Sequence, residues 1–265
     1  MRLFIGLLTL LLCAPATLLA EDSITLDTRP GVKQSFLLLT PAQKPVATVI
    51  LFAGGNGHIQ LDGVSIAWGK NNFLVRTRQQ FADAGFLVAV VDAPSDRQGS
   101  NGMLGGFRVS PEHVMDIEVV IRHLKQQASV PVWLVGTSRG TESAAHVAIH
   151  GKQRTDGVVL TSSMSEANSN GKAVTEMALD RVKVPVLIVA HRDDGCHQTP
   201  AQGAERIKQR LTAAPKVEVR YFMGGDPPRS KPCEAQSAHG FLGIETEVVD
   251  AIAGFIKANR PAGGS

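Results

Sequence analysis

The stretch Val132-Trp133-Leu134-Val135-Gly136-Thr137-Ser138-Arg139-Gly140 decides the fold. Residues 132–135 form a predicted buried strand, and a predicted helix follows from Ser138 to about His150. A turn this tight leaves no room for a Cβ at Gly136 or Gly140. It strains Ser138, lifts its side chain above the sheet and places it at a helix N-terminus, where negative charge is stabilised. The turn therefore predicts a nucleophile; the alternative is an ordinary N-cap serine.

Apolar strands and amphipathic helices alternate along the rest of the chain, which predicts one domain with a mostly parallel sheet covered on both faces. In such sheets ligands bind beyond the carboxyl ends of the strands. The expected strands are 46–52, 86–91, 132–135, 157–160, 186–190 and 217–222, and the expected helices are 76–84, one beginning at a Ser110 cap, 138–150, 200–211 and 244–258.

Two further strand ends carry groups that would activate a serine. Asp193 and Asp194 follow the strand 186–190, and Asp194 is the preferred orienting acid because Asp193 lies nearer the strand end with less freedom to turn. His239 follows the last strand and precedes Gly240, which lets the loop swing back over the sheet. The predicted base is therefore His239, and the chain order is Ser, Asp, His.

The glycine-rich segment 53–57 follows the first predicted strand, and it predicts an oxyanion hole. Acyl transfer passes through a tetrahedral oxyanion that needs backbone N–H donors already in place. We expect one donor from Arg139 and the other from Gly55 or Asn56. A phosphate-binding P-loop is excluded because no Lys-Ser/Thr pair follows the glycines.

Taken together, these residues resemble the α/β-hydrolase superfamily, and more narrowly its small secreted dienelactone-hydrolase-like or prolyl-oligopeptidase-like serine hydrolases. The resemblance covers the chain from about Glu21 onward and implies an eight-stranded, mostly parallel sheet with a Ser138–His239–Asp194 triad. Two departures are Ala53, where a histidine often precedes the oxyanion glycines, and the acid loop 193–196. The short segment between the strands 157–160 and 186–190 leaves no room for a large lid domain.

Two long loops, 58–72 with Trp68 and 95–109 with Met103, are expected to shape the pocket instead. In the second loop, three charged residues could meet a charged substrate group, although solvated loop charges are the commoner case. They are Asp96, Arg97 and Arg108.

Residues 1–20 predict a cleaved signal peptide, because Arg2 precedes a short apolar run and small residues. Possible cleavage sites follow Ala16 and Ala20, and a membrane anchor is the alternative. The mature chain, 21–265, then keeps Cys196 and Cys233, which we expect to bridge in an oxidising compartment. That bridge would tie the acid loop to the base loop. The expected location is periplasmic or secreted.

Composition narrows the functional classes. The 265-residue chain has a net charge of only +3 and 5% aromatic residues, which argues against nucleic-acid binding. We expect hydrolysis of a small-molecule carboxylic ester without cofactor or metal, and no stable membrane insertion after cleavage. The alternatives are amide or peptide hydrolysis by the same triad, and a non-catalytic binding protein of the same fold. A third is a metal-dependent protein built on His191, Asp193, Asp194, Cys196 and His197.

Overall fold

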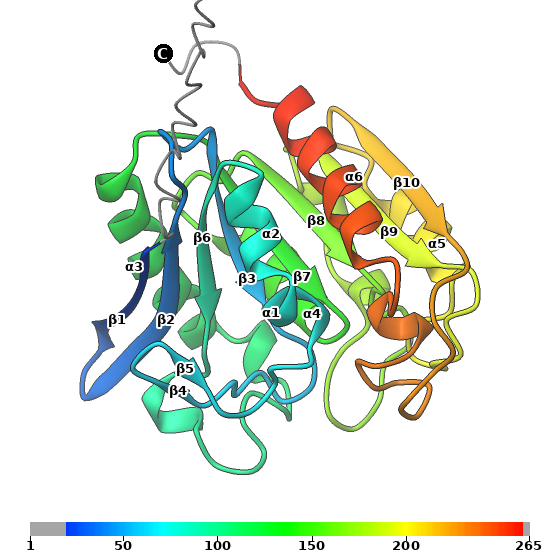
Figure 1. Ribbon diagram of the computed structural model, residues 1–265, viewed down its shortest axis with the longest axis horizontal. Coiled ribbons are helices and arrows are strands. Elements are labelled where there is room, and N and C mark those ends of the chain that lie inside the picture. Colours follow the sequence, from blue (N-terminus) through cyan, green and yellow to red (C-terminus); the bar gives the residue numbers. More distant parts are fainter. Residues whose placement is uncertain (1–19, 262–265) are drawn as a thin grey trace, which may run out of the picture.

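The computed structural model describes residues 20–261, and its centre is an eight-stranded sheet (Figure 1). The strand order is β1-β2-β6-β3-β7-β8-β9-β10. β2 runs antiparallel to β1 and β6, and all other neighbouring pairs are parallel. The predicted mostly parallel, eight-stranded sheet is therefore confirmed. The strands are β1 (Ala20–Arg29), β2 (Val32–Thr40), β3 (Ala47–Phe52), β6 (Phe86–Val91), β7 (Val132–Thr137), β8 (Gly157–Thr161), β9 (Val186–His191) and β10 (Val217–Phe222).

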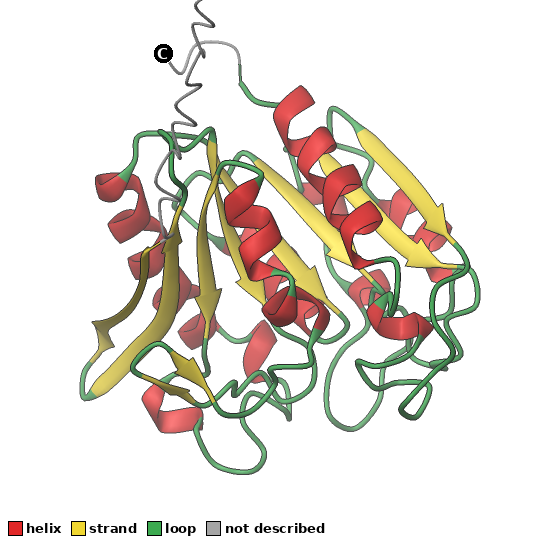
Figure 2. Ribbon diagram, in the orientation of Figure 1, coloured by secondary structure: helices red, strands yellow, loops and turns green. Residues whose placement is uncertain are grey.

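Helices cover both faces of this sheet, as Figure 2 shows. One face packs against α3 (Pro111–Gln127), α4 (Gly140–His150) and α5 (Gly203–Arg210). The other packs against α1 (Phe73–Arg76), α2 (Arg78–Asp83) and α6 (Glu245–Ala258). A separate two-stranded ribbon, β4 (Leu61–Asp62) with β5 (Ser65–Ile66), lies in the loop before α1. Residues 162–185, between β8 and β9, contain two short 3-10 turns, and no lid domain occurs within the described chain.

Sequence patterns missed the first two strands and one helix break. Alternating polar residues in β1 and the turn at Gly31 fit an edge hairpin, and only the adjoining strand is largely buried. The expected helix 76–84 instead begins at Phe73 and is interrupted at Thr77, whose hydroxyl donates to the Phe73 carbonyl at 2.7 Å. That bond closes the turn of α1 and offers the backbone an alternative to a continuous helix.

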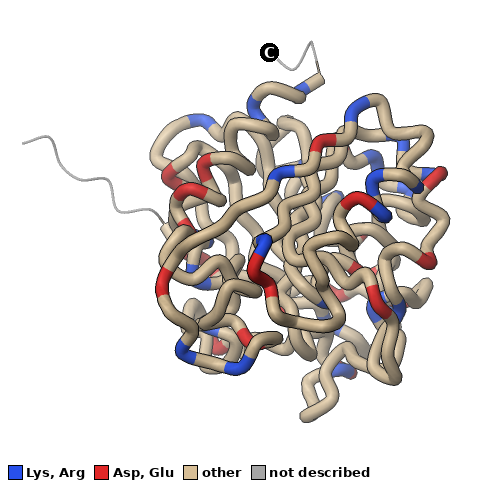
Figure 3. Tube along the Cα trace, turned by 90° about the vertical axis from the view of Figure 1, so that its right-hand side faces the viewer, with Lys and Arg blue, Asp and Glu red and all other residues tan. Residues whose placement is uncertain are grey.

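Charged residues of both signs are mixed over the face seen in Figure 3. Among the described residues, no helix is long and apolar enough to cross a membrane. The predicted leader, residues 1–20, lies outside the described residues except for Ala20, the first residue of β1.

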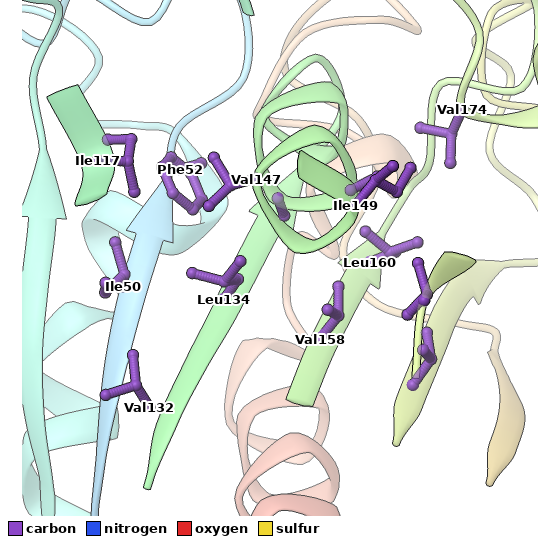
Figure 4. Close-up of a cluster of buried hydrophobic side chains, with 14 of the residues drawn as sticks. Ile50, Phe52, Ile117, Val132, Leu134, Val147, Ile149, Val158, Leu160 and Val174 are labelled. Carbon is purple, nitrogen blue, oxygen red and sulfur yellow. The ribbon is translucent and has the colours of Figure 1, made fainter. Parts of the chain in front are cut away.

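The carboxyl ends of the central strands are held in fixed positions, because these strands are buried between closely packed layers of helices. Figure 4 shows Ile50 and Phe52 of β3 beside Leu134 of β7, and Val147 of α4 packs against them. All of these side chains are nearly inaccessible to solvent. Because close-packed interiors do not deform readily, the loops that follow β3, β7 and β9 leave the sheet from fixed points.

Candidate functional site

Ser138 occupies the strained turn between β7 and α4. Its φ is +51°, in the left-handed region that L-residues other than glycine rarely adopt. A Cβ on Gly136 would lie 2.3 Å from the Gly140 carbonyl oxygen, and a Cβ on Gly140 would lie 2.0 Å from the Phe52 carbonyl oxygen. Gly136 therefore lets the start of α4 fold closely onto the end of β7, and Gly140 lets the turn press against β3, while Ser138 carries the strained left-handed backbone conformation.

His239 lies in a 3-10 turn, Ala238–Gly240, between β10 and α6. Its loop is held by other elements: Arg76 of α1 donates to the carbonyls of Ala235 and Gly240, and the Ser162 hydroxyl donates to the His239 carbonyl at 2.8 Å. A Cβ on Gly240 would lie 1.9 Å from the Ala235 carbonyl oxygen, so this position requires glycine for close approach. The imidazole is almost fully buried.

The structure brings Asp194, and not Asp193, beside His239. Asp194 Oδ2 lies 3.0 Å from His239 Nδ1, whereas Asp193 is 73% exposed and its Oδ2 lies 3.9 Å from His191 Nδ1. An ionised carboxylate can only accept hydrogen bonds, so Nδ1 carries the proton and Nε2 is left with its lone pair.

Thr199 is a contact that the sequence did not suggest. Its hydroxyl donates to Asp194 Oδ2 at 2.9 Å and lies 3.0 Å from His239 Nδ1. Asp194 Oδ1 also accepts from the Cys196 backbone N–H at 2.9 Å. Three groups therefore fix the Asp194 carboxylate. A threonine inside a loop has no spacing or period that would identify this role.

Cys196 and Cys233 form the predicted disulfide. Cys196 is buried two residues after Asp194, and Cys233 is exposed six residues before His239. The bond therefore joins the loop after β9 to the loop that carries His239.

A cleft of about 550 Å³ lies at the carboxyl ends of the strands, and both Ser138 and His239 line it. Its wall includes the segment 53–59, the segment 67–73 with Trp68, and residues 233–235. The first predicted pocket-shaping loop, 58–72, therefore contributes as expected. The second, 95–109, does not line this cleft and packs behind the segment 53–57 instead.

The predicted oxyanion donors lie at this cleft. Gly55 and Asn56 line it, and Arg139 immediately follows Ser138. The backbone N–H groups of these three residues have no acceptor within residues 20–261. The Arg139 side chain is fixed by Glu142 Oε1 at 3.3 Å and Asn168 Oδ1 at 2.7 Å.

The three charged residues of the loop 95–109 do not face the cleft. Asp96 pairs with Arg29 at 3.1 Å, and the Arg97 guanidinium stacks 4.6 Å from the centre of the Phe107 ring. Arg108 is only 1% exposed. Burial lowers the pKa of Arg108 to about 10, which still leaves it cationic at neutral pH. Burial also raises the pKa of Glu142, whose carboxyl interacts electrostatically with Arg108.

The residues of the alternative metal site do not converge. Cys196 is in a disulfide, Asp194 contacts His239, and the buried His191 has Nε2 3.0 Å from the Gly224 carbonyl. In the part of the chain that is described, no group of three or more His, Cys, Asp or Glu side chains could hold a metal ion.

Neither a family model nor a curated protein sequence matches the chain, but solved structures do. A cold-adapted esterase from an Arctic intertidal metagenomic library matches with a TM-score of 0.66 at 14% identity, over 94% of this chain and 97% of the esterase. Est1E from Butyrivibrio proteoclasticus matches with a TM-score of 0.62 at 14% identity, over 90% of this chain and 98% of Est1E.

Peptidases share the architecture as well. Pyrococcus horikoshii acylaminoacyl peptidase matches with a TM-score of 0.63 at 12% identity, over 91% of this chain but 42% of the peptidase. At such low identity these similarities concern the fold alone. They confirm that the chain has the α/β-hydrolase fold.

Proposed function

We propose that this α/β-hydrolase-fold protein is a serine hydrolase that cleaves a carboxylic ester through an acyl-enzyme on Ser138. The observation that carries the proposal is that a strained serine and a buried histidine, itself bonded to a carboxylate, line the same cleft. Ser138 has a φ of +51°, and His239 Nδ1 lies 3.0 Å from Asp194 Oδ2.

In the proposed reaction, His239 Nε2 accepts the Ser138 hydroxyl proton as the oxygen attacks the ester carbonyl carbon. Asp194 holds the required tautomer and stabilises the imidazolium that forms. The backbone N–H of Arg139, with that of Gly55 or Asn56, donates to the oxyanion. His239 then protonates the leaving alcohol, and a water molecule activated by the same histidine hydrolyses the acyl-enzyme.

The cleft supports a small substrate with an apolar part. Its apolar lining includes Ile59, Trp68 and Phe73, and its volume of about 550 Å³ is in the range of small-molecule sites. The esterases named above match over nearly their whole length, whereas the peptidase match leaves more than half of that chain uncovered. Ester hydrolysis is therefore favoured over peptide hydrolysis.

We further propose that the mature domain, 21–265, acts in the periplasm or outside the cell after removal of residues 1–20. A disulfide that joins the two catalytic loops supports an oxidising compartment.

The test is hydrolysis by the purified mature protein of p-nitrophenyl esters of increasing acyl length, beside matched p-nitroanilides. We expect ester turnover that is lost in Ser138→Ala and kept in Ser23→Ala, an exposed control serine in β1. Faster cleavage of the anilides would support the amide alternative. Ester turnover that survives in Ser138→Ala would contradict the proposal.

A further inference from the structure

We propose that Arg108, a buried residue outside the cleft, is a positioning residue that aims the oxyanion-hole N–H of Asn56 and places a positive charge behind it. This inference rests on the proposed serine-hydrolase function. Arg108 belongs to the loop 95–109, which lies behind the segment 53–57 and contributes nothing to the cleft wall.

The guanidinium binds the oxyanion segment through its carbonyl oxygens. Arg108 Nη2 donates to the Ala53 carbonyl at 2.9 Å and to the Gly55 carbonyl at 3.3 Å. Nη1 donates to the Ser143 hydroxyl of α4 at 2.8 Å. The same loop adds a backbone bond, from Met103 N–H to the Asn56 carbonyl at 2.8 Å. Three carbonyls of the segment are therefore turned toward the loop behind it.

The direction of a carbonyl determines the direction of the next N–H. A trans peptide is planar, so the C=O of one residue and the N–H of the next point in opposite directions. All described peptide bonds are trans. When Arg108 holds the Gly55 carbonyl on the far side, the N–H of Asn56 must point the other way. The N–H of Gly55 instead follows the Gly54 carbonyl, which accepts from the Gly57 N–H and not from Arg108, so the arginine orients the N–H of Asn56 and not that of Gly55. The Asn56 N–H has no acceptor in the described chain, and Asn56 lines the cleft.

The Arg108 guanidinium can approach the segment 53–57 closely because position 57 is a glycine. A Cβ on Gly57 would lie 2.4 Å from Arg108 Nη2 and 2.3 Å from Met103 Cε. A Cβ on Gly102 would lie 2.4 Å from the Asn56 carbonyl oxygen. The glycines at both sides thus permit the contact that Arg108 and Met103 make.

The charge of Arg108 is the second part of its role. The side chain is 1% exposed and stays cationic at neutral pH, and the buried Glu142 that acts on it is itself paired with the Arg139 guanidinium at 3.3 Å. Charges act more strongly where water is excluded. A fixed cation behind the N–H donors favours the negative oxygen of the tetrahedral intermediate over the neutral ester carbonyl, so its contribution should appear in kcat and not in KM.

The test measures kcat and KM for one p-nitrophenyl ester, together with inhibition by an alkylboronic acid that forms a tetrahedral adduct on serine. Removal of one oxyanion donor typically costs ~100-fold to 1000-fold in kcat, so loss of its support in Arg108→Met should cost roughly 10-fold to 100-fold, with KM changed less than about threefold. Boronate affinity should fall with kcat. Arg108→Lys keeps the positive charge but loses the planar guanidinium with its two donor nitrogens, so its kcat should lie between those of the wild type and Arg108→Met.

Two variants separate this role from general stability. Arg97→Met removes an exposed charge from the same loop and should retain wild-type kcat. Ser143→Ala removes only the contact that anchors Nη1, and should lower kcat and boronate affinity together while the protein stays folded.

The inference is overturned if Arg108→Lys and Ser143→Ala both keep wild-type kcat, or if KM changes and kcat does not. Those outcomes leave the proposed function intact, because the wild type remains active. If the wild-type protein neither turns over esters nor reacts at Ser138, the proposed function itself fails and this inference falls with it.

Discussion

Replacement of Asp194 by asparagine should abolish most of the activity through the histidine tautomer. Asp194 Oδ2 faces His239 Nδ1 and the Thr199 hydroxyl, and Oδ1 faces the Cys196 backbone N–H. All three are donors, so an amide nitrogen at either position would oppose a donor. The imidazole can relieve the conflict by moving its proton to Nε2, and it then cannot accept the proton of Ser138.

The expected magnitude follows from this loss of the active tautomer. A comparable change in a serine-protease triad lowers kcat by ~10⁴, equivalent to about 5 kcal/mol of transition-state stabilisation. Thr199 can still orient the ring, so we expect a loss between about 10³ and 10⁴ here. The substitution replaces a carboxylate oxygen that accepts hydrogen bonds with a buried amide NH₂ that faces other donors, which should also cost roughly 1–3 kcal/mol of stability.

The matched control is Asp193→Asn, which changes the neighbouring, largely exposed carboxylate. Steady-state kinetics of both variants on one ester, with urea unfolding to confirm folding, gives the comparison. Asp193→Asn should stay within about threefold of wild type, since exposed charges contribute little. The reasoning is refuted if Asp194→Asn keeps near-wild-type kcat, or if Asp193→Asn loses as much.

Three further predictions concern stability. Gly140→Ala places a methyl 2.0 Å from a carbonyl oxygen of β3 and should destabilise the folded protein by at least ~2 kcal/mol. Gly254→Ala, in α6 and facing open space, should stabilise it by up to about 1 kcal/mol. Thermal unfolding that ranks the two variants the other way would contradict this. The double variant Cys196→Ser, Cys233→Ser removes a disulfide between residues 37 positions apart, which should cost about 4 kcal/mol of stability by loop entropy. It should also lower kcat, because the loops that carry Asp194 and His239 are no longer joined. Unchanged urea stability and unchanged turnover would refute a role of the disulfide in holding these loops. Burial lowers the pKa of His113 to about 3, so the unfolded chain binds a proton that the native state excludes, and stability falls as pH drops below about 6.5. Between pH 6.5 and about pH 5 this loss is roughly 2 kcal/mol, and His113→Leu should remove it from urea unfolding measured across that range; an equal acid loss in variant and wild type would count against it.

Periodicity predicted the elements whose side chains are uniformly buried. The central strands, including β3 and β7, are mainly apolar and fully buried, and the Ser110 cap marked the start of α3 correctly. The edge strand β1 was missed because it is half polar and has no long apolar run, and β2 was missed although it contains the buried apolar run 36–39. Local patterns also gave no reason for α1 to break at Thr77.

The candidate site was predictable where a short motif imposes geometry. The pattern from Gly136 to Gly140 implies the strained turn directly, whereas the choice of Asp194 over Asp193 depends on how a loop folds. Thr199 had no signal, because its contact with His239 joins loops 40 residues apart in the sequence. Arg108 was predicted only to meet a charged substrate group, because its partners lie in segments far away along the chain. An arginine in a glycine-rich loop is usually solvated, and only tertiary packing shows that this one is buried.

The central claim is that Ser138 is an activated nucleophile. The most direct measurement treats the purified mature protein with a fluorophosphonate probe and locates the adduct by peptide mass spectrometry. We expect one adduct on Ser138, absent in His239→Ala, because the reaction needs the base that Asp194 orients. A folded wild-type protein that carries no adduct on Ser138, or one whose labelling is unchanged in His239→Ala, would contradict the account.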